Sequence, residues 1–140
     1  MLFRFVPLKE RGGFIIMGTI TINRKKSIMG SIEWYCAVNL TKEDFEARAF
    51  KAKGSVLKAL VNVKDYGFDP TGMPPDASVT IIKNGATVEI PIGTGTNTMF
   101  IATKPESKFI YSDITEVQDG RTYFPKIKAV GLNSSKFIID

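Results

Sequence analysis

Residues 19–38 read T-I-T-I-N-R-K-K-S-I-M-G-S-I-E-W-Y-C-A-V, and this stretch decides the expected fold. Its first part alternates threonine with the apolar residues Ile20 and Ile22, which is the period of a strand with one buried face. A second apolar run begins at Trp34, after a basic connection that contains serine and glycine. Two strands joined in this way predict a β-hairpin.

Short strands separated by turn residues continue after residue 77. Asn84-Gly85 suits a type I′ turn, so the sequence predicts a second hairpin with Ile81 opposite Val88. A Gly-Thr-Gly turn leads onward, and further strands are expected at residues 97–103, 108–114 and 121–130. This spacing favours a sandwich over a βαβ unit. The predicted fold is therefore mainly β, an antiparallel β-sandwich of about seven strands with one inserted amphipathic helix.

The helix is expected within residues 41–63, where the apolar period changes from two to that of a helix. Thr41 followed three residues later by Asp44 is typical of a helix N-cap. Gly54 leaves open a shorter helix followed by a strand at 55–63. A proline-rich loop follows, so residues 39–77 form an insertion in the β-domain. The predicted buried face of the helix consists of Phe45, Ala49, Ala52, Val56, Leu60 and Val63.

At 140 residues the chain has the length of a single domain, which we place at 17–140. Residues 1–16 are interpreted as a translated leader, because Gly12-Gly13 can be encoded as a ribosome-binding sequence and Met17 would then be the initiator. A genuine N-terminal strand or arm is the alternative. Without the leader, 16 basic and 13 acidic residues remain, and the net charge falls from +5 to +3. No membrane span or secretory signal is recognised, so a cytoplasmic setting is expected.

The amino-acid composition excludes several classes of catalytic mechanism. Histidine is absent and Cys36 is the only cysteine, which excludes histidine-based acid/base chemistry, Ser-His and Cys-His pairs and Cys/His zinc sites. Cys36 stands among aromatic and apolar residues and is expected to be a buried thiol. Asp65, Asp69 and Asp76 lack the spacing of a calcium loop. No metal, no cofactor and no enzymatic activity are therefore predicted.

A wider pattern surrounds the first stretch. Its spacing is R-x-x-S-x-x-G-S-x-x-x-Y, formed by Arg24, Ser27, Gly30, Ser31 and Tyr35. This pattern resembles a bacterial family of small β-sandwich domains of unknown function, similar in style to PEGA-like domains. A Lys-Asn-Gly turn at 83–85, a strand ending in Pro91 and a closing strand at 120–124 extend the resemblance. It implies a β-sandwich fold and a bacterial source, while the insertion at 39–77 leaves any shared function open.

The candidate ligand-binding residues lie in the same stretch: Arg24, Lys25, Lys26, Ser27 and Trp34. Basic side chains of this kind contact phosphates, and an aromatic ring can stack on a base. The favoured alternative is a solvated loop with Trp34 or Tyr35 in the core, because the net charge is small for a nucleic-acid binder. We therefore predict a non-enzymatic binding or protein-interaction module, with a protein partner or a homo-oligomer. A nucleic-acid or nucleotide-phosphate binder is the second hypothesis, and a carboxylate-dependent hydrolase is the third.

Overall fold

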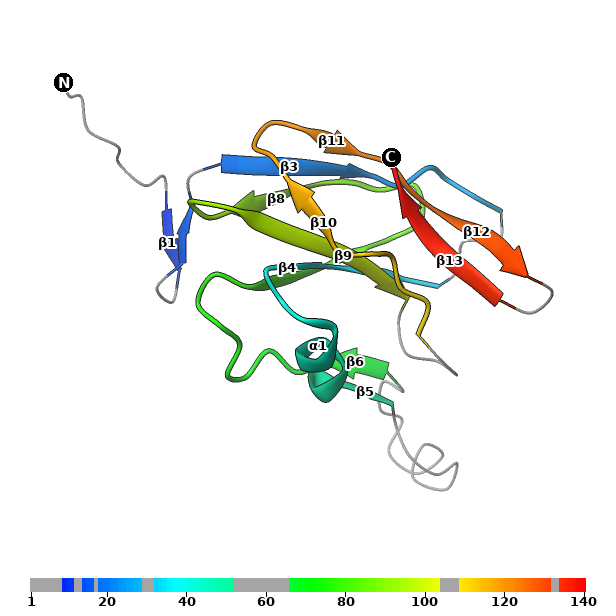
Figure 1. Cartoon of the computed structure of the whole chain (residues 1–140), viewed down its shortest axis with the longest axis horizontal. Helices are drawn as coiled ribbons and strands as arrows, with labels where there is room; N and C mark the ends of the chain where they lie inside the picture. The colour runs from blue at the N-terminus through cyan, green and yellow to red at the C-terminus, as the bar shows by residue number, and fades with distance from the viewer. Residues whose placement is uncertain are drawn as a thin grey trace.

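The computed structural model describes residues 9–11, 14–16, 18–28, 32–51, 66–103, 109–131 and 134–140. Two sheets stack on each other, a three-stranded sheet in the order β11-β3-β8 and a four-stranded sheet in the order β10-β9-β4-β7 (Figure 1). Helix α1 and the pair β5-β6 lie on the other side of the four-stranded sheet (Figure 1). The prediction of a mainly β fold with one helix is confirmed for the described part of the chain.

The strands of the two sheets have the following bounds. The three-stranded sheet contains β3 (Gly18–Asn23), β8 (Thr87–Ile92) and β11 (Thr122–Tyr123). The four-stranded sheet contains β4 (Trp34–Val38), β7 (Ser78–Ile82), β9 (Asn97–Thr103) and β10 (Thr115–Val117). Two-stranded pairs are formed by β1 (Lys9–Arg11) with β2 (Phe14–Ile16), β5 (Ala49–Lys51) with β6 (Tyr66–Phe68), and β12 (Pro125–Gly131) with β13 (Ser134–Ile139).

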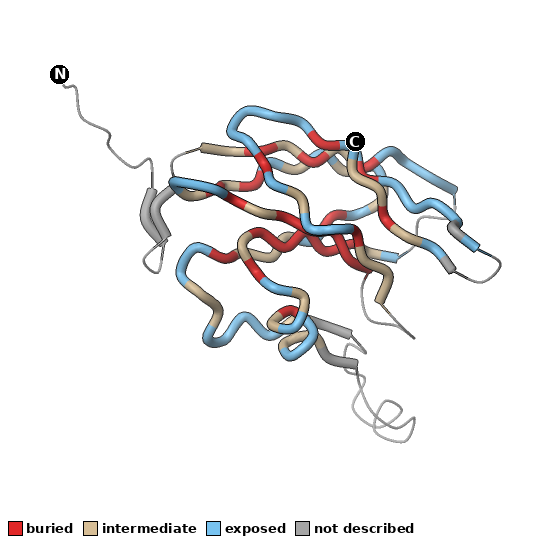
Figure 2. The backbone as a smooth tube through the Cα atoms, in the orientation of Figure 1, coloured by how far each residue is buried: buried red, intermediate tan, exposed pale blue. Residues whose placement is uncertain are grey.

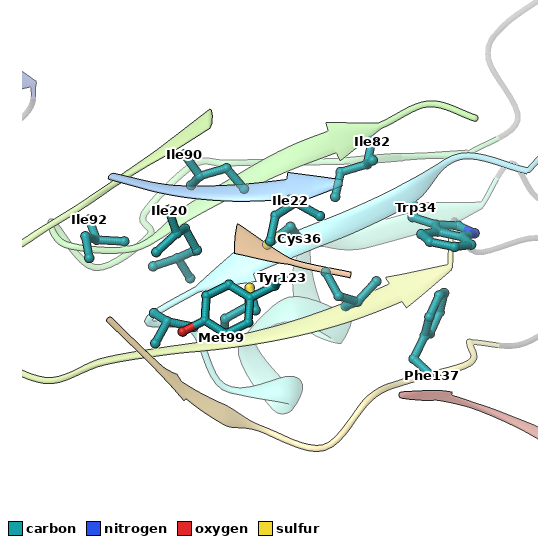
Figure 3. Close-up of a cluster of buried hydrophobic side chains, with 13 residues drawn as sticks. Ile20, Ile22, Trp34, Cys36, Ile82, Ile90, Ile92, Met99, Tyr123 and Phe137 are labelled. Atoms are coloured by element: carbon teal, nitrogen blue, oxygen red, sulfur yellow. The ribbon is translucent and has the colours of Figure 1, made fainter. Parts of the chain in front are cut away.

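The main core fills the space between the two sheets (Figure 3). Ile20 and Ile22 are fully buried while their neighbours on β3 are not, which confirms the alternation expected for this strand. Both side chains pack with Cys36 of β4 and Ile101 of β9 across the core. Burying an isoleucine side chain contributes roughly 1.5–3 kcal/mol. This core therefore holds the two sheets together, and buried residues mark it along the facing strands (Figure 2).

The hairpin predicted within residues 19–38 is wrong. β3 pairs with β8 and β11, whereas β4 pairs with β7 and β9, so the connection crosses from one sheet to the other. The reason is the burial of β4, all five residues of which are buried. A strand without a solvated face needs a central place in a sheet that is covered on both sides. Stacking β3 over β4 directs the apolar residues of both strands into one core.

The second predicted hairpin is also wrong, because β7 and β8 belong to different sheets. Ile81 pairs with Tyr35 and Val88 pairs with Ile22, so the expected register does not form. At the turn, the Ala86 N–H donates to the Lys83 carbonyl over 3.0 Å. Gly85 has a φ of 78° and Asn84 is not in the positive region, whereas a type I′ turn needs two positive φ values.

Helix α1 (Lys42–Arg48) is shorter than predicted. Its N-cap is confirmed, since the Asp44 N–H donates to Thr41 Oγ1 over 3.0 Å. The predicted helical position of Ala49 is wrong, because this residue already belongs to β5 and pairs with Phe68. Of the predicted buried face, only Phe45 is both helical and buried in the described part of the chain. The remaining positions lie outside the described residues: Ala52, Val56, Leu60 and Val63.

A second apolar cluster covers the outer face of the four-stranded sheet. Phe45 is fully buried there and packs against Tyr35 of β4 and Phe100 of β9. The loop after β6 is tied to the helix, because the Arg48 guanidinium donates to the Gly72 carbonyl over 2.8 Å. Residues 39–51 and 66–77 of the insertion therefore supply a third layer, which explains why β4 is buried on both faces.

The C-terminal part departs from the prediction in three ways. The strand expected at 108–114 is wrong, because the described residues of this range form only an isolated bridge between Tyr111 and Ala102, and β10 begins at Thr115. The expected strand at 121–130 is divided into β11 and β12, and β11 pairs with β3 in parallel, so the sandwich is not entirely antiparallel. β13 was not predicted, although its Phe137 is buried and meets Trp34 edge to face at 4.8 Å between ring centroids. Among the described residues, no helix has the length and apolar character that crossing a membrane requires.

Candidate functional site

A cavity of about 410 Å³ opens where the parallel pair β3-β11 ends. The pairing covers only Thr21 with Thr122 and Ile22 with Tyr123. The segments that follow, residues 24–27 after β3 and the start of β12, line the same cavity. We call it the strand-end cavity, and its described lining consists of Arg24, Lys25, Lys26, Ser27, Ile32, Trp34, Thr103, Ile110, Pro125, Lys126 and Ile127. All five sequence-predicted site residues are therefore brought together.

Arg24 is the buried charged residue of this lining, with 2% of its surface exposed. Its guanidinium carbon lies 3.8 Å from the centroid of the Trp34 ring, in cation–π contact. Nη1 donates to the Ile82 carbonyl over 2.7 Å, and Nη2 donates to the Ile32 carbonyl over 2.9 Å. Burial lowers the pKa of Arg24, and Glu33 opposes this shift. The side chain therefore connects β7, β4 and the segment after residue 31, and acts as a positioning residue.

Trp34 has no open face for a stacked base. Only 8% of its surface is exposed, because Arg24 covers the ring and Phe137 contacts it. The stacking role considered for Trp34 is therefore not available in this arrangement. Both Trp34 and Tyr35 are buried, which agrees with the alternative that places them in the core.

The backbone of Ser27 is held in place by the side-chain amide of Asn84. The Ser27 N–H donates to Asn84 Oδ1 over 2.9 Å, and Asn84 Nδ2 donates to the Ser27 carbonyl over 2.7 Å. Lys25 and Lys26 are exposed at the rim of the cavity. The two hydrogen bonds to Ser27 therefore anchor the backbone segment that carries both lysines.

Sequence reasoning missed the residues that β12 contributes. Lys126 adds a third lysine and makes an exposed ion pair with Asp140 at 3.4 Å, which contributes little to stability. Ile127 is 43% exposed and Ile32 is 37% exposed, so both present apolar surface near the lysines. The only local pattern that could have indicated these residues is the alternation of charged and apolar side chains in Lys126-Ile127-Lys128. Without the parallel pairing of β3 and β11, nothing connected it to the residues after β3.

The possible metal ligands stay apart. In the part of the chain that the structure describes, no three Asp, Glu, His or Cys side chains gather in a way that could hold a metal ion. Asp69 accepts hydrogen bonds from the Thr71 N–H and hydroxyl, and these lower its pKa. The Asp69 carboxylate therefore stabilises the local turn at residues 69–71. Asp65 lies outside the described residues.

Comparison of the chain with models of protein families, with curated proteins and with solved structures found no match. The resemblance to the PEGA-like domains therefore stays a prediction. The assignment of a function rests on the geometry of the strand-end cavity.

Cys36 is expected to resist thiol reagents in the folded protein. It is fully buried in the main core, and this burial raises the pKa of its thiol well above the ordinary 9.0. The pKa of this thiol is therefore higher in the folded chain than in the unfolded chain. The neutral thiol contributes fully to folding stability below pH 9, and this contribution decreases as the pH rises above 9. Titration with Ellman's reagent at pH 8 should give no thiol in the native protein and one thiol per chain in guanidinium. Rapid native labelling would contradict this.

Proposed function

We propose that the chain is a non-enzymatic binding module that holds an anionic ligand in the strand-end cavity. The observation that carries this proposal is the combination of three exposed lysines, Lys25, Lys26 and Lys126, with apolar lining residues that include Ile110 and Pro125. The volume of the strand-end cavity lies within the range of about 300–1,000 Å³ that is typical of small-ligand sites. Lysines provide charge-assisted hydrogen bonds to an anion, and the apolar lining residues offer contacts to the uncharged part of a ligand.

The lining residues support binding rather than catalysis. Those that the structure describes include no carboxylate, histidine or cysteine, so they offer no carboxylate pair, no histidine base and no thiol nucleophile. The covered ring of Trp34 favours a ligand that is held by its charge over stacked bases. These features support an anion-binding module ahead of a hydrolase or a nucleic-acid binder.

Inorganic pyrophosphate is a suitable first probe, and its binding should depend on the three exposed lysines. In a titration followed by ¹⁵N NMR, the amides of Lys25, Lys26 and Lys126 should shift and saturate. Replacing all three lysines by alanine should weaken binding by about tenfold or more, because charge-assisted hydrogen bonds are lost.

A matched control carries the same change in net charge elsewhere. Lys42, Lys83 and Lys136 do not line the strand-end cavity, and their triple alanine variant should bind pyrophosphate nearly as the wild type does. Absence of saturable shifts in the wild type would contradict the proposed function. Equal losses in both triple variants would also contradict it, since they would show a general effect of charge.

A further inference from the structure

The strand β12 has one side without a partner strand among the described residues. It pairs with β13 alone. Phe124 and Asp140, just outside this pair, exchange two backbone hydrogen bonds of 3.0 and 3.3 Å. Because hydrogen-bonding direction alternates along an antiparallel strand, Pro125 and Ile127 direct their backbone groups away from β13. Pro125 has no N–H to offer and is typical of an edge strand, so the first complete donor–acceptor pair on this side belongs to Ile127.

The side chains of β12 separate into a charged and an apolar face. Lys126 and Lys128 share one face, and Ile127 points to the other. Ile127 is 43% exposed and belongs, with the 37% exposed Ile32, to the lining of the strand-end cavity. A strand added to this edge would place alternate residues beside the lysines and beside Ile127, since directly opposite Cβ atoms lie about 4.5–5.5 Å apart.

We propose that the anionic ligand of the strand-end cavity is an extended acidic segment of a partner protein, which adds to β12 as a strand. This inference rests on the proposed function and names the partner class for the same site. Acidic residues of the segment face Lys25, Lys26, Lys126 and Lys128, and its alternate apolar residues cover Ile127 and Ile32. A small inorganic anion would occupy only the lysines, leaving the apolar walls and the backbone edge of β12 uncovered.

Strand addition of this type is one of the common modes of peptide recognition. The main-chain hydrogen bonds supply affinity and the alternate side chains supply specificity. Here the charge complementarity selects an acidic partner, and the backbone of Ile127, which has no partner strand on this side among the described residues, selects an extended one. The dependence on backbone amides separates this mode from simple attraction between opposite charges.

The test uses the peptide acetyl-Asp-Val-Glu-Val-Asp-Val-Glu-amide with the full chain. Trp34 is the only tryptophan of the chain and lines the cavity, so its fluorescence can report binding. Two further peptides carry N-methyl groups on alternate residues, one on the valines and one on the acidic residues. In a strand, alternate amides point to opposite sides, so one methylated peptide should bind about tenfold more weakly and the other should bind nearly unchanged.

Two protein variants and two competing probes complete the experiment. Ile127→Ser, which removes the apolar contact without adding a charge, should reduce peptide binding while circular dichroism shows a retained fold, and Lys42→Ala should bind as the wild type. If pyrophosphate binds and the peptide does not, the acidic-strand inference fails and the proposed function stands. If neither binds, both fail. Equal weakening by the two methylation patterns, or tighter binding of a single-stranded oligonucleotide than of the peptide, would overturn the inference.

Discussion

Replacing Phe45 by alanine is expected to lower the free energy of unfolding by about 3–5 kcal/mol, the usual cost of removing a buried phenyl ring. The ring is fully buried, and its centroid lies 5.2–5.6 Å from those of Tyr35, Phe68 and Phe100. These contacts join α1, β6 and the four-stranded sheet. The cavity left behind has walls from three elements, so we expect it to collapse only partly. Denaturation in urea, followed by circular dichroism, measures the change.

Glu43→Gln on the same helix is the matched control. This side chain is exposed in the first turn, and its replacement should stay within about 0.5 kcal/mol of the wild type. If Phe45→Ala and Glu43→Gln unfold at the same urea concentration, α1 does not contribute to the stability of the sandwich. The third layer would then be dispensable for the fold.

Replacing Arg24 by alanine is expected to cost about 3 kcal/mol or more of folding stability. The carbonyls of Ile82 and Ile32 each lose a charged donor, and such hydrogen bonds contribute about 1.5–3 kcal/mol apiece. The cation–π contact with Trp34 is lost as well. Arg24→Lys should recover only part of the loss, because an ammonium cannot reproduce the planar fork. Chemical denaturation of both variants provides the comparison.

Lys25→Ala is the control for Arg24→Ala, because the two basic residues are adjacent and only Arg24 is buried. Lys25 is exposed, and its removal should leave the free energy of unfolding nearly unchanged. A stable Arg24→Ala protein that no longer binds pyrophosphate would contradict the positioning role. It would show that Arg24 is needed for the ligand and not for the stability of the packing around Trp34.

The features that could be predicted from the sequence are those decided within a few residues. The alternation of Ile20 and Ile22, the N-cap at Thr41 and the strand at 97–103 depend on local pattern, and all are found in the structure. The two hairpins failed because alternation shows which side chains are buried and does not show whether two strands pair or stack. The helix was too long because Ala49 fits an apolar helical face as well as it fits β5.

In the candidate site too, only the residues that are close in sequence could be predicted. Arg24, Lys25, Lys26 and Ser27 are consecutive, so their grouping was visible in the sequence. Lys126 and Ile127 reach the cavity only because β11 pairs with β3 in parallel, and no local pattern encodes that contact. The burial of Trp34 against Phe137 depends on β13 and could not be inferred either.

The crossing of the chain between sheets has a consequence for the rate at which the protein folds. β3 pairs with strands that are far away in the sequence. Asn23 pairs with Thr87 of β8, and Thr21 pairs with Thr122 of β11. Such distant pairings require large loops to close before any hydrogen bond is gained, and folds dominated by them reach the native state in about milliseconds to seconds. During synthesis on the ribosome, β3 emerges before β8 and β11 and stays without each of these partners until the strand that forms it has followed.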